Sequence, residues 1–224
     1  MAVRTVAALA ALAAACVGCS DPKKASEANF AKAIGQYLAQ RGQVCIRSLT
    51  RSWPADVDAN AKPVRNSFGS ESEAMRLDAL AQAGLLRTEM TEVEQRSFYG
   101  RPAPPRPVRR YHLAEAAKPF VRTSPSGAIH GPEHHHDICW ARRALHKVVQ
   151  WEGPMAFGEY QVARVTYTYR LEDVAPWVEH PAVKASFPEI ATEQTPSRDR
   201  TEHRKVNLTS NGWQAEGLNE RFFH

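Results

Sequence analysis

Residues 160–171 read YQVARVTYTYRL and alternate between two faces of an extended chain. One face carries Val162, Arg164, Thr166, Thr168 and Arg170, and the other carries Ala163, Val165, Tyr167, Tyr169 and Leu171. Alternation over this length, in a stretch rich in β-branched and aromatic residues, is typical of a strand with one buried face. The stretch predicts a half-buried strand of an antiparallel sheet.

The segments on either side predict the rest of a small sheet. Residues 140–151 form a long, largely apolar segment before the strand, and residues 172–177 predict the start of a short helix after it. Residues 203–218 predict a closing hairpin. Turns are predicted at Gly153-Pro154, at Gly158 and at Ser210-Asn211-Gly212. Residues 139–224 are therefore expected to form an antiparallel α+β unit.

Residues 26–122 predict a second unit of helices and a hairpin. A helix begins at Ser26-Glu27, carries Phe30, Ile34, Tyr37 and Leu38 at helical spacing, and ends at Gly42. A second amphipathic helix begins near Glu71. An extended run at 87–98, a Pro-rich tip at 100–107 and a return strand at 109–113 follow.

Two stretches of this unit resemble winged-helix proteins. LDALAQAGLL at 77–86 is similar to their leucine-rich helix, and YHLAEAA at 111–117 is similar to the segment that closes their wing, with Ala114 and Ala117 where the family has Thr and Gly. The resemblance implies a winged-helix scaffold over 26–122. The helix offers Glu71, Glu73 and Asp78 against Arg76 alone, so it lacks the basic surface that binds phosphates, and we expect no nucleic-acid partner.

Residues 1–18 have the pattern of a secretory signal peptide. Arg4 supplies one positive charge, and residues 5–17 are uncharged and rich in Ala and Leu. This run is too short to cross a bilayer, which takes about 20 apolar residues.

The residues that follow, Val17-Gly18-Cys19-Ser20, resemble the lipobox of bacterial lipoproteins. The resemblance implies that acyl chains such as palmitate modify Cys19, that Cys19 becomes the first residue of the mature chain, and that residues 19–25 form a lipidated tether. Cys16, which stands where the family usually has Leu, is the alternative lipid site, and cleavage after Ala13-Ala14-Ala15 without a lipid is another reading. Ser20 in place of Asp favours the outer membrane over the inner one.

Cys45 and Cys139 are the remaining thiols once the signal is removed and Cys19 is acylated. An even pair in an oxidising compartment predicts a disulfide. The bond would close a loop of nearly a hundred residues. The resulting loss of entropy in the unfolded chain would stabilise the folded state by about 4 to 5 kcal/mol. Two separate buried free cysteines are the alternative reading.

Residues 123–138 predict a linker, and a cluster of His130, Glu133, His134, His135, His136 and Asp137 lies within it. Imidazole and thiolate bind transition metals, so His134, His136 and Cys139 are an alternative metal site. Adjacent residues of an extended chain alternate sides, however, which favours a solvated loop without a metal.

Aromatic residues of the second unit suggest a ligand groove made by Trp151, Tyr167, Tyr169 and Trp177. Packing in the core is the more ordinary use of such residues. No nucleophile elbow, zinc-protease helix, phosphate loop or dinucleotide fingerprint occurs. The acid pair Glu172-Asp173 is better explained as a cap between a strand and a helix than as a pair of catalytic groups. We therefore expect no enzyme and no cofactor.

The composition fits a globular exported domain, with 43% hydrophobic residues, 24% charged residues and a net charge of +5. The leading hypothesis is a membrane-anchored, periplasm-facing lipoprotein that acts as a non-catalytic binding or accessory module of the cell envelope. Its partners would be the bilayer, through the acyl anchor, and an envelope protein or cell-wall component. The alternative is a periplasmic metal-binding lipoprotein that uses the 130–139 cluster. The leading hypothesis predicts an exposed apolar patch or groove on the C-terminal half.

Overall fold

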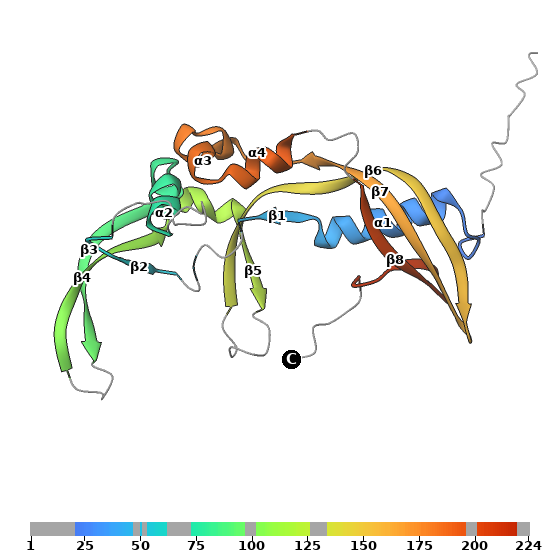
Figure 1. Ribbon diagram of the computed structural model, residues 1–224, viewed down its shortest axis with the longest axis horizontal. Helices are drawn as coiled ribbons and strands as arrows, with labels where there is room; N and C mark the ends of the chain where they lie inside the picture. Colours follow the sequence, from blue (N-terminus) through green and yellow to red (C-terminus); the bar gives the residue numbers. More distant parts are fainter. Residues whose placement is uncertain are drawn as a thin grey trace, which may run out of the picture.

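The computed structural model describes residues 21–46, 50, 53–61, 73–96, 102–125, 134–195 and 201–218. These residues form an α+β fold with two antiparallel sheets (Figure 1). The predicted signal peptide and both candidate lipid sites, Cys19 and Cys16, lie outside the described residues. In the described ranges, no helix is long and apolar enough to cross a membrane.

The larger sheet is built around a long hairpin of β6 (His134–Phe157) and β7 (Tyr160–Glu172). Its strand order is β1-β6-β7-β8-β9, with β1 at Gln43–Cys45, β8 at Glu202–Thr209 and β9 at Gly212–Ala215. β5 (Val121–Pro125) pairs with the beginning of β6. The strand predicted over 160–171 is confirmed as β7, and the predicted closing hairpin is confirmed as β8–β9.

Helix α1 (Glu27–Arg41) covers one face of this sheet. The Ser26 hydroxyl accepts a hydrogen bond from the Asn29 amide at 3.4 Å, and the Gly42 amide donates to the Leu38 carbonyl at 2.8 Å, so both predicted helix ends are confirmed. The buried face of α1 and the sheet form the first core, which we call the sheet cluster. It consists of Phe30, Ala33, Ile34, Leu38, Val148, Ala163, Val165, Tyr167, Val206, Trp213 and Ala215.

The smaller sheet has the order β2-β4-β3, with β2 at Ala55–Asp58, β3 at Leu86–Arg96 and β4 at Pro102–Leu113. We call its β3–β4 hairpin the arm. The predicted Pro-rich tip at 100–107 is wrong in extent, because β4 already begins at Pro102. Prolines are tolerated there because β2 pairs with β4 only from Val108 onward, which leaves residues 102–107 with β3 as their one strand neighbour in the described chain.

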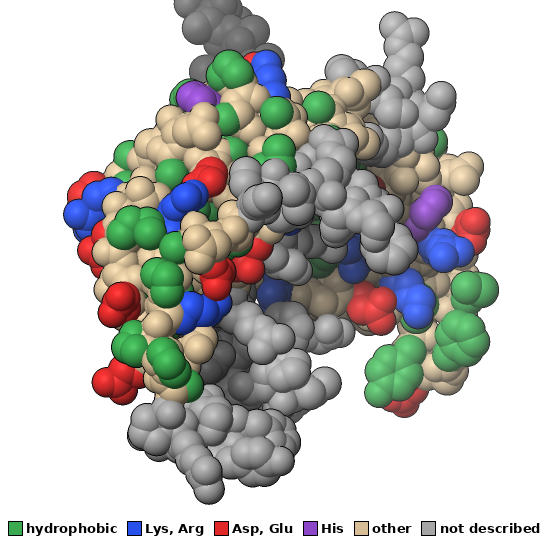
Figure 2. All heavy atoms as spheres, turned by 60° about the vertical axis from the view of Figure 1, so that its left-hand side comes forward, with side chains coloured by type: hydrophobic (Ala, Val, Ile, Leu, Met, Phe, Trp, Pro, Cys, Tyr) green, Lys and Arg blue, Asp and Glu red, His purple; other side chains and the backbone are tan. Residues whose placement is uncertain are grey.

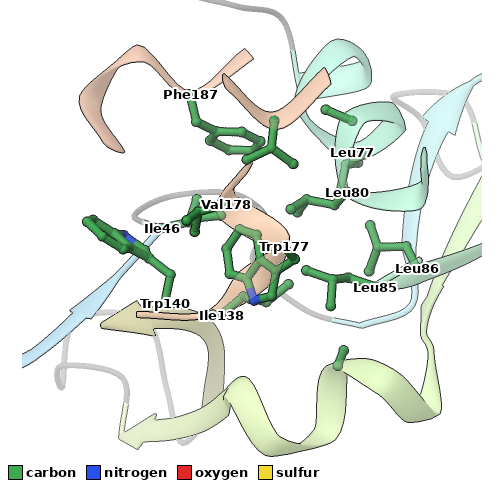
Figure 3. Close-up of a cluster of buried hydrophobic side chains, with 14 of the residues drawn as sticks. Ile46, Leu77, Leu80, Leu85, Leu86, Ile138, Trp140, Trp177, Val178 and Phe187 are labelled. Atoms are coloured by element: carbon green, nitrogen blue, oxygen red, sulfur yellow. The ribbon is translucent and has the colours of Figure 1, made fainter. Parts of the chain in front are cut away.

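Four short helices join α2 (Glu73–Gln82) in closing a second core. They are η1 (Glu115–Phe120), η2 (Pro176–Glu179), α3 (Pro181–Ser186) and α4 (Pro188–Gln194). This central cluster includes Leu77, Leu80, Leu85, Trp140, Trp177 and Phe187, and Figure 3 shows these side chains converging from different elements.

The two cores do not follow the boundary predicted at residues 123–138. α1 belongs to the predicted first unit but packs in the sheet cluster, and Trp177 and Phe187 of the predicted second unit pack with α2. Residues 123–125 and 134–138 of the predicted linker belong to the paired strands β5 and β6. β6 contributes Trp140 to one core and Val148 to the other, so a single strand connects both clusters.

Candidate functional site

The four aromatic residues predicted to line one groove do not form a single group, because Trp177 lies in a different core from the other three. Trp177 lies in the central cluster, whereas Tyr167 is buried in the sheet cluster. Tyr169 is partly buried, and its hydroxyl donates to Glu193 at 2.6 Å. Trp151 packs its ring edge-on against Phe30, at 5.4 Å between centroids, and remains 38% exposed.

Cys45 and Cys139 form a disulfide between β1 and β6, as predicted. The Cys139 sulfur is therefore not available as a thiolate ligand. His134 and His136 lie on β6 two residues apart, and His136 is exposed. No group of three or more His, Cys, Asp or Glu side chains in the described residues is arranged to hold a metal ion.

The acidic side chains nearest the core are held by arginines. Arg109 donates to both carboxylate oxygens of Asp78 at 2.9 Å, and the Tyr111 hydroxyl donates to the same carboxylate at 2.7 Å. Burial, together with that hydrogen bond, raises the pKa of Tyr111 to about 12. Such a tyrosine stays protonated at neutral pH, so this group fixes β4 to α2 and is not poised for proton transfer.

A second charged group joins α4 to the large sheet. Arg143 donates to Glu193 at 2.8 and 3.0 Å, and its guanidinium lies over the ring of Tyr169 at 4.7 Å. The acid pair suggested by the sequence is also neutralised, because Arg142 lies 2.7 Å from Glu172 and 3.2 Å from Asp173. On the face that Figure 2 shows, positive and negative side chains are interspersed and no broad area has one sign. These contacts indicate a structural role for the charges.

A pocket of about 410 Å³ lies on α3 and α4. It is lined by Lys184, Ile190, Ala191, Gln194 and Thr195, and most of its surface is apolar. Lys184 forms an ion pair with Glu179 at 2.6 Å. This lining contains no pairing of a nucleophile with a base, so it offers no catalytic arrangement.

The most unusual surface is the end of the β6–β7 hairpin. Met155, Phe157 and Tyr160 are 51%, 62% and 75% exposed. Phe157 is opposite Tyr160 in the strand register, and Met155 is opposite Val162, so these side chains share one face of the hairpin. We call Met155, Phe157 and Tyr160 the apolar tip.

The apolar tip lies beyond the part of β7 that is paired with β8. β8 pairs with β7 only from Val162 onward, and the turn at Gly158 reverses the chain with a φ of +61°. Gly153, where β6 carries a register shift between Glu152 and Met155, also has a positive φ. The hairpin therefore presents three large apolar side chains to solvent where no described element covers them.

The start of the described chain lies at the same end of the molecule. The Trp213 indole donates to the carbonyl of Lys23 at 3.1 Å, and a Cβ added to Gly212 would lie 2.8 Å from the carbonyl oxygen of Pro22. The Asn29 side chain donates to the carbonyls of Asp21 and Lys24 at 2.9 and 2.8 Å. Figure 1 shows the beginning of α1 and the β6–β7 turn at one end, with the arm at the other.

The sequence predicted the turns of this hairpin and an exposed apolar patch or groove on the C-terminal half, but not the residues that form the tip. Gly153-Pro154 and Gly158 were recognisable as turn signals. The available signal was the presence of Met155, Phe157 and Tyr160 within five residues of a glycine turn, where polar residues are usual.

Comparison with protein-family models, with curated proteins and with solved structures gave no match to this chain.

Proposed function

We propose that this protein is a membrane-anchored lipoprotein that faces the periplasm and acts as a non-catalytic binding or accessory module of the cell envelope, with the apolar tip as its binding surface. The observation that carries the proposal is the exposed tip. Contiguous exposed apolar side chains at the end of an otherwise well-packed sheet are typical of an interaction site.

Two further features support the proposal. Residues that resemble a lipobox directly precede the tether, so the acylated residue would be Cys19. The Cys45–Cys139 disulfide is of a kind common in exported proteins and rare in the reducing cytosol. With the Cys139 sulfur occupied, the metal-binding alternative would depend on His134 and His136 without a thiolate.

The winged-helix likeness also belongs to the proposal. α2 followed by the β3–β4 hairpin has the order of a helix and its wing. α1 packs in the sheet cluster, so we limit the proposed likeness to α2, β3 and β4 and assign it no DNA-binding role.

Fractionation of cells that express the full chain tests the anchor. Because one thioether-linked diacyl group and a further acyl chain hold a protein at a bilayer almost permanently, we expect the wild-type protein and the matched Cys16→Ser variant in the membrane fraction. The Cys19→Ser variant should carry no acyl chain and should be absent from the membrane fraction. Retention of Cys19→Ser in the membrane together with release of Cys16→Ser would move the anchor to Cys16, and release of the wild type would contradict the proposal.

A further inference from the structure

Resting on the proposed anchor at Cys19, we propose that the partner of the apolar tip is the surface of the same bilayer that carries the anchor. The hairpin then lies on the membrane by the face that carries Met155, Phe157 and Tyr160, and the protein has a fixed orientation with the arm pointing away.

The tether and the tip are close enough for both to reach one surface. Pro22 contacts Gly212 of β9, Gly212 is paired with Thr209 of β8, and β8 is the strand next to β7. Neighbouring strands are about 4.8 Å apart, so about two strand spacings separate the tether from β7. Two residues extend at most about 7 Å, so a lipid on Cys19 emerges beside Asp21 at this end of the molecule.

The tip has the chemistry of an interfacial surface. Phe157 and Met155 are apolar, and Tyr160 combines an apolar ring with a polar hydroxyl, which suits the boundary between acyl chains and headgroups. Trp151 is opposite Val165 and packs beside Phe30, so it lies on the α1 face of the hairpin and is not part of this surface. Removal of the side chains of the apolar tip from water is favourable in proportion to the apolar area buried.

The charges around the tip fit headgroup contact. Arg164 follows Val162 on the same face and is paired with Lys205 of β8, and both are exposed. Glu152 is opposite Arg164, and Glu159 occupies the turn. Because a carboxylate at the turn resists entry into the acyl region, the hairpin lies flat with its charges among the headgroups. The apolar side chains therefore contribute most to membrane binding, and attraction to anionic lipid contributes less.

A protein strand added to β6 is a less suitable occupant. Beyond Arg142 the outer edge of β6 has no strand neighbour in the described chain, but three register shifts interrupt β6 between Leu145 and Met155. Bulges of this kind bend a strand and disrupt the ladder that another strand would need. Contact with a fluid lipid surface does not require a regular ladder of backbone hydrogen bonds.

The experiment uses the full-length lipidated protein, purified from membranes with its disulfide formed and reconstituted into vesicles of phosphatidylcholine with or without phosphatidylglycerol. An environment-sensitive fluorophore is attached to a new cysteine in Glu159→Cys, beside the tip. Glu94→Cys, on the exposed arm, is the matched control. Emission, quenching by spin-labelled lipids and co-flotation with the vesicles are measured in the same samples.

We expect the fluorophore at position 159 to shift to shorter wavelength and to be quenched by the lipids, while the fluorophore at position 94 remains in water. Combining Glu159→Cys with Met155→Ser, Phe157→Ser and Tyr160→Ser should lower the lipid quenching by about tenfold, because the apolar area that drives contact is gone. Combining Glu159→Cys with Met90→Ser, in place of the three tip substitutions, should leave the lipid quenching unchanged.

Co-flotation separates the two proposals. If the protein does not float with vesicles, the anchor fails. If it floats while the fluorophore at 159 stays in water, the anchor stands and the membrane contact is overturned. Protection of position 159 only in native envelope membranes, and not in vesicles of lipid alone, would also overturn it and would indicate a protein partner.

Discussion

The two ends of the molecule each present a long hairpin, and the two hairpins have different surfaces. On the smaller sheet that carries the arm, polar side chains pair across neighbouring strands, with Arg110 of β4 held by Asp56 of β2 at 2.7 Å and His112 of β4 facing Glu89 of β3 at 3.1 Å. Met90 is the large apolar side chain exposed there among the described residues. At the other end, the β6–β7 hairpin terminates in the apolar tip. Hairpins of similar backbone geometry therefore expose mainly charged side chains at one end of the molecule and large apolar side chains at the other.

Core substitutions in the two clusters should have the largest effect and should show whether the ends fold together. Phe187 in the central cluster and Phe30 in the sheet cluster are both fully buried. Phe187→Ala and Phe30→Ala should each lower the free energy of unfolding by about 3 to 5 kcal/mol. Because β6 contributes to both clusters, each variant should shift one common urea transition, followed by circular dichroism and by tryptophan fluorescence.

Two separate transitions, with Phe30→Ala moving one and Phe187→Ala moving the other, would contradict this coupling. They would instead support two independently folding units.

Removal of the disulfide should have the next largest effect. Cys45 and Cys139 are separated by 94 residues, and a crosslink over such a loop stabilises by at most about 4 to 5 kcal/mol through the entropy of the unfolded chain. The double variant Cys45→Ala, Cys139→Ala should unfold at lower urea than the oxidised wild type. The urea midpoint of the wild type treated with reductant should approach the midpoint of the double variant. If both midpoints equal that of the oxidised wild type, the bond does not contribute to stability.

The alkaline stability of the arm end should depend on Tyr111. Its pKa is about 12 in the folded protein and about 10 in an unfolded chain. A pKa raised by folding contributes stability that is complete below pH 10 and is lost as the pH rises from 10 to 12, on the order of 2 kcal/mol in total. Tyr111→Phe should remove this part of the pH dependence in urea titrations.

The matched control is Tyr160→Phe, at the exposed tip, which should leave the alkaline profile as in the wild type. A Tyr111→Phe protein that loses stability between pH 10 and 12 as steeply as the wild type would contradict the assignment.

Substitution of the tip should have the smallest effect on stability. Met155→Ser, Phe157→Ser and Tyr160→Ser together should change the free energy of unfolding by less than about 0.5 kcal/mol per site, because exposed side chains make few contacts in the folded state. Met90→Ser on the arm is the control of similar exposure. A loss of several kcal/mol in the urea transition would mean that the tip is packed against the protein and is not a free surface.

Local patterns predicted the elements of this fold better than its cores. Alternation in residues 160–171 predicted β7, and Ser26 and Gly42 marked the ends of α1, because periodicity and caps are encoded within a few residues. The cores depend on contacts far apart in sequence. α1 packs on β6, β8 and β9, α2 packs on α3, and no local pattern specifies such partners.

The candidate site could be predicted only in part. The even cysteine pair indicated the disulfide, because the expected export would leave two thiols in an oxidising compartment. The prediction of a single aromatic groove was wrong, since Trp177 and Tyr167 fill different cores. Composition does not reveal which face of a strand is covered. The apolar tip depends on the pairing of β8 with β7 starting only at Val162, which is a property of register and not of composition.

Intact-mass spectrometry of the mature protein extracted from membranes, before and after thiol alkylation, tests the central claim most directly. We expect a chain that begins at an acylated Cys19 and takes up no alkylating reagent, because Cys45 and Cys139 are joined. An unacylated chain that begins after Ala15 would contradict the membrane anchor and, with it, the proposed orientation of the hairpin.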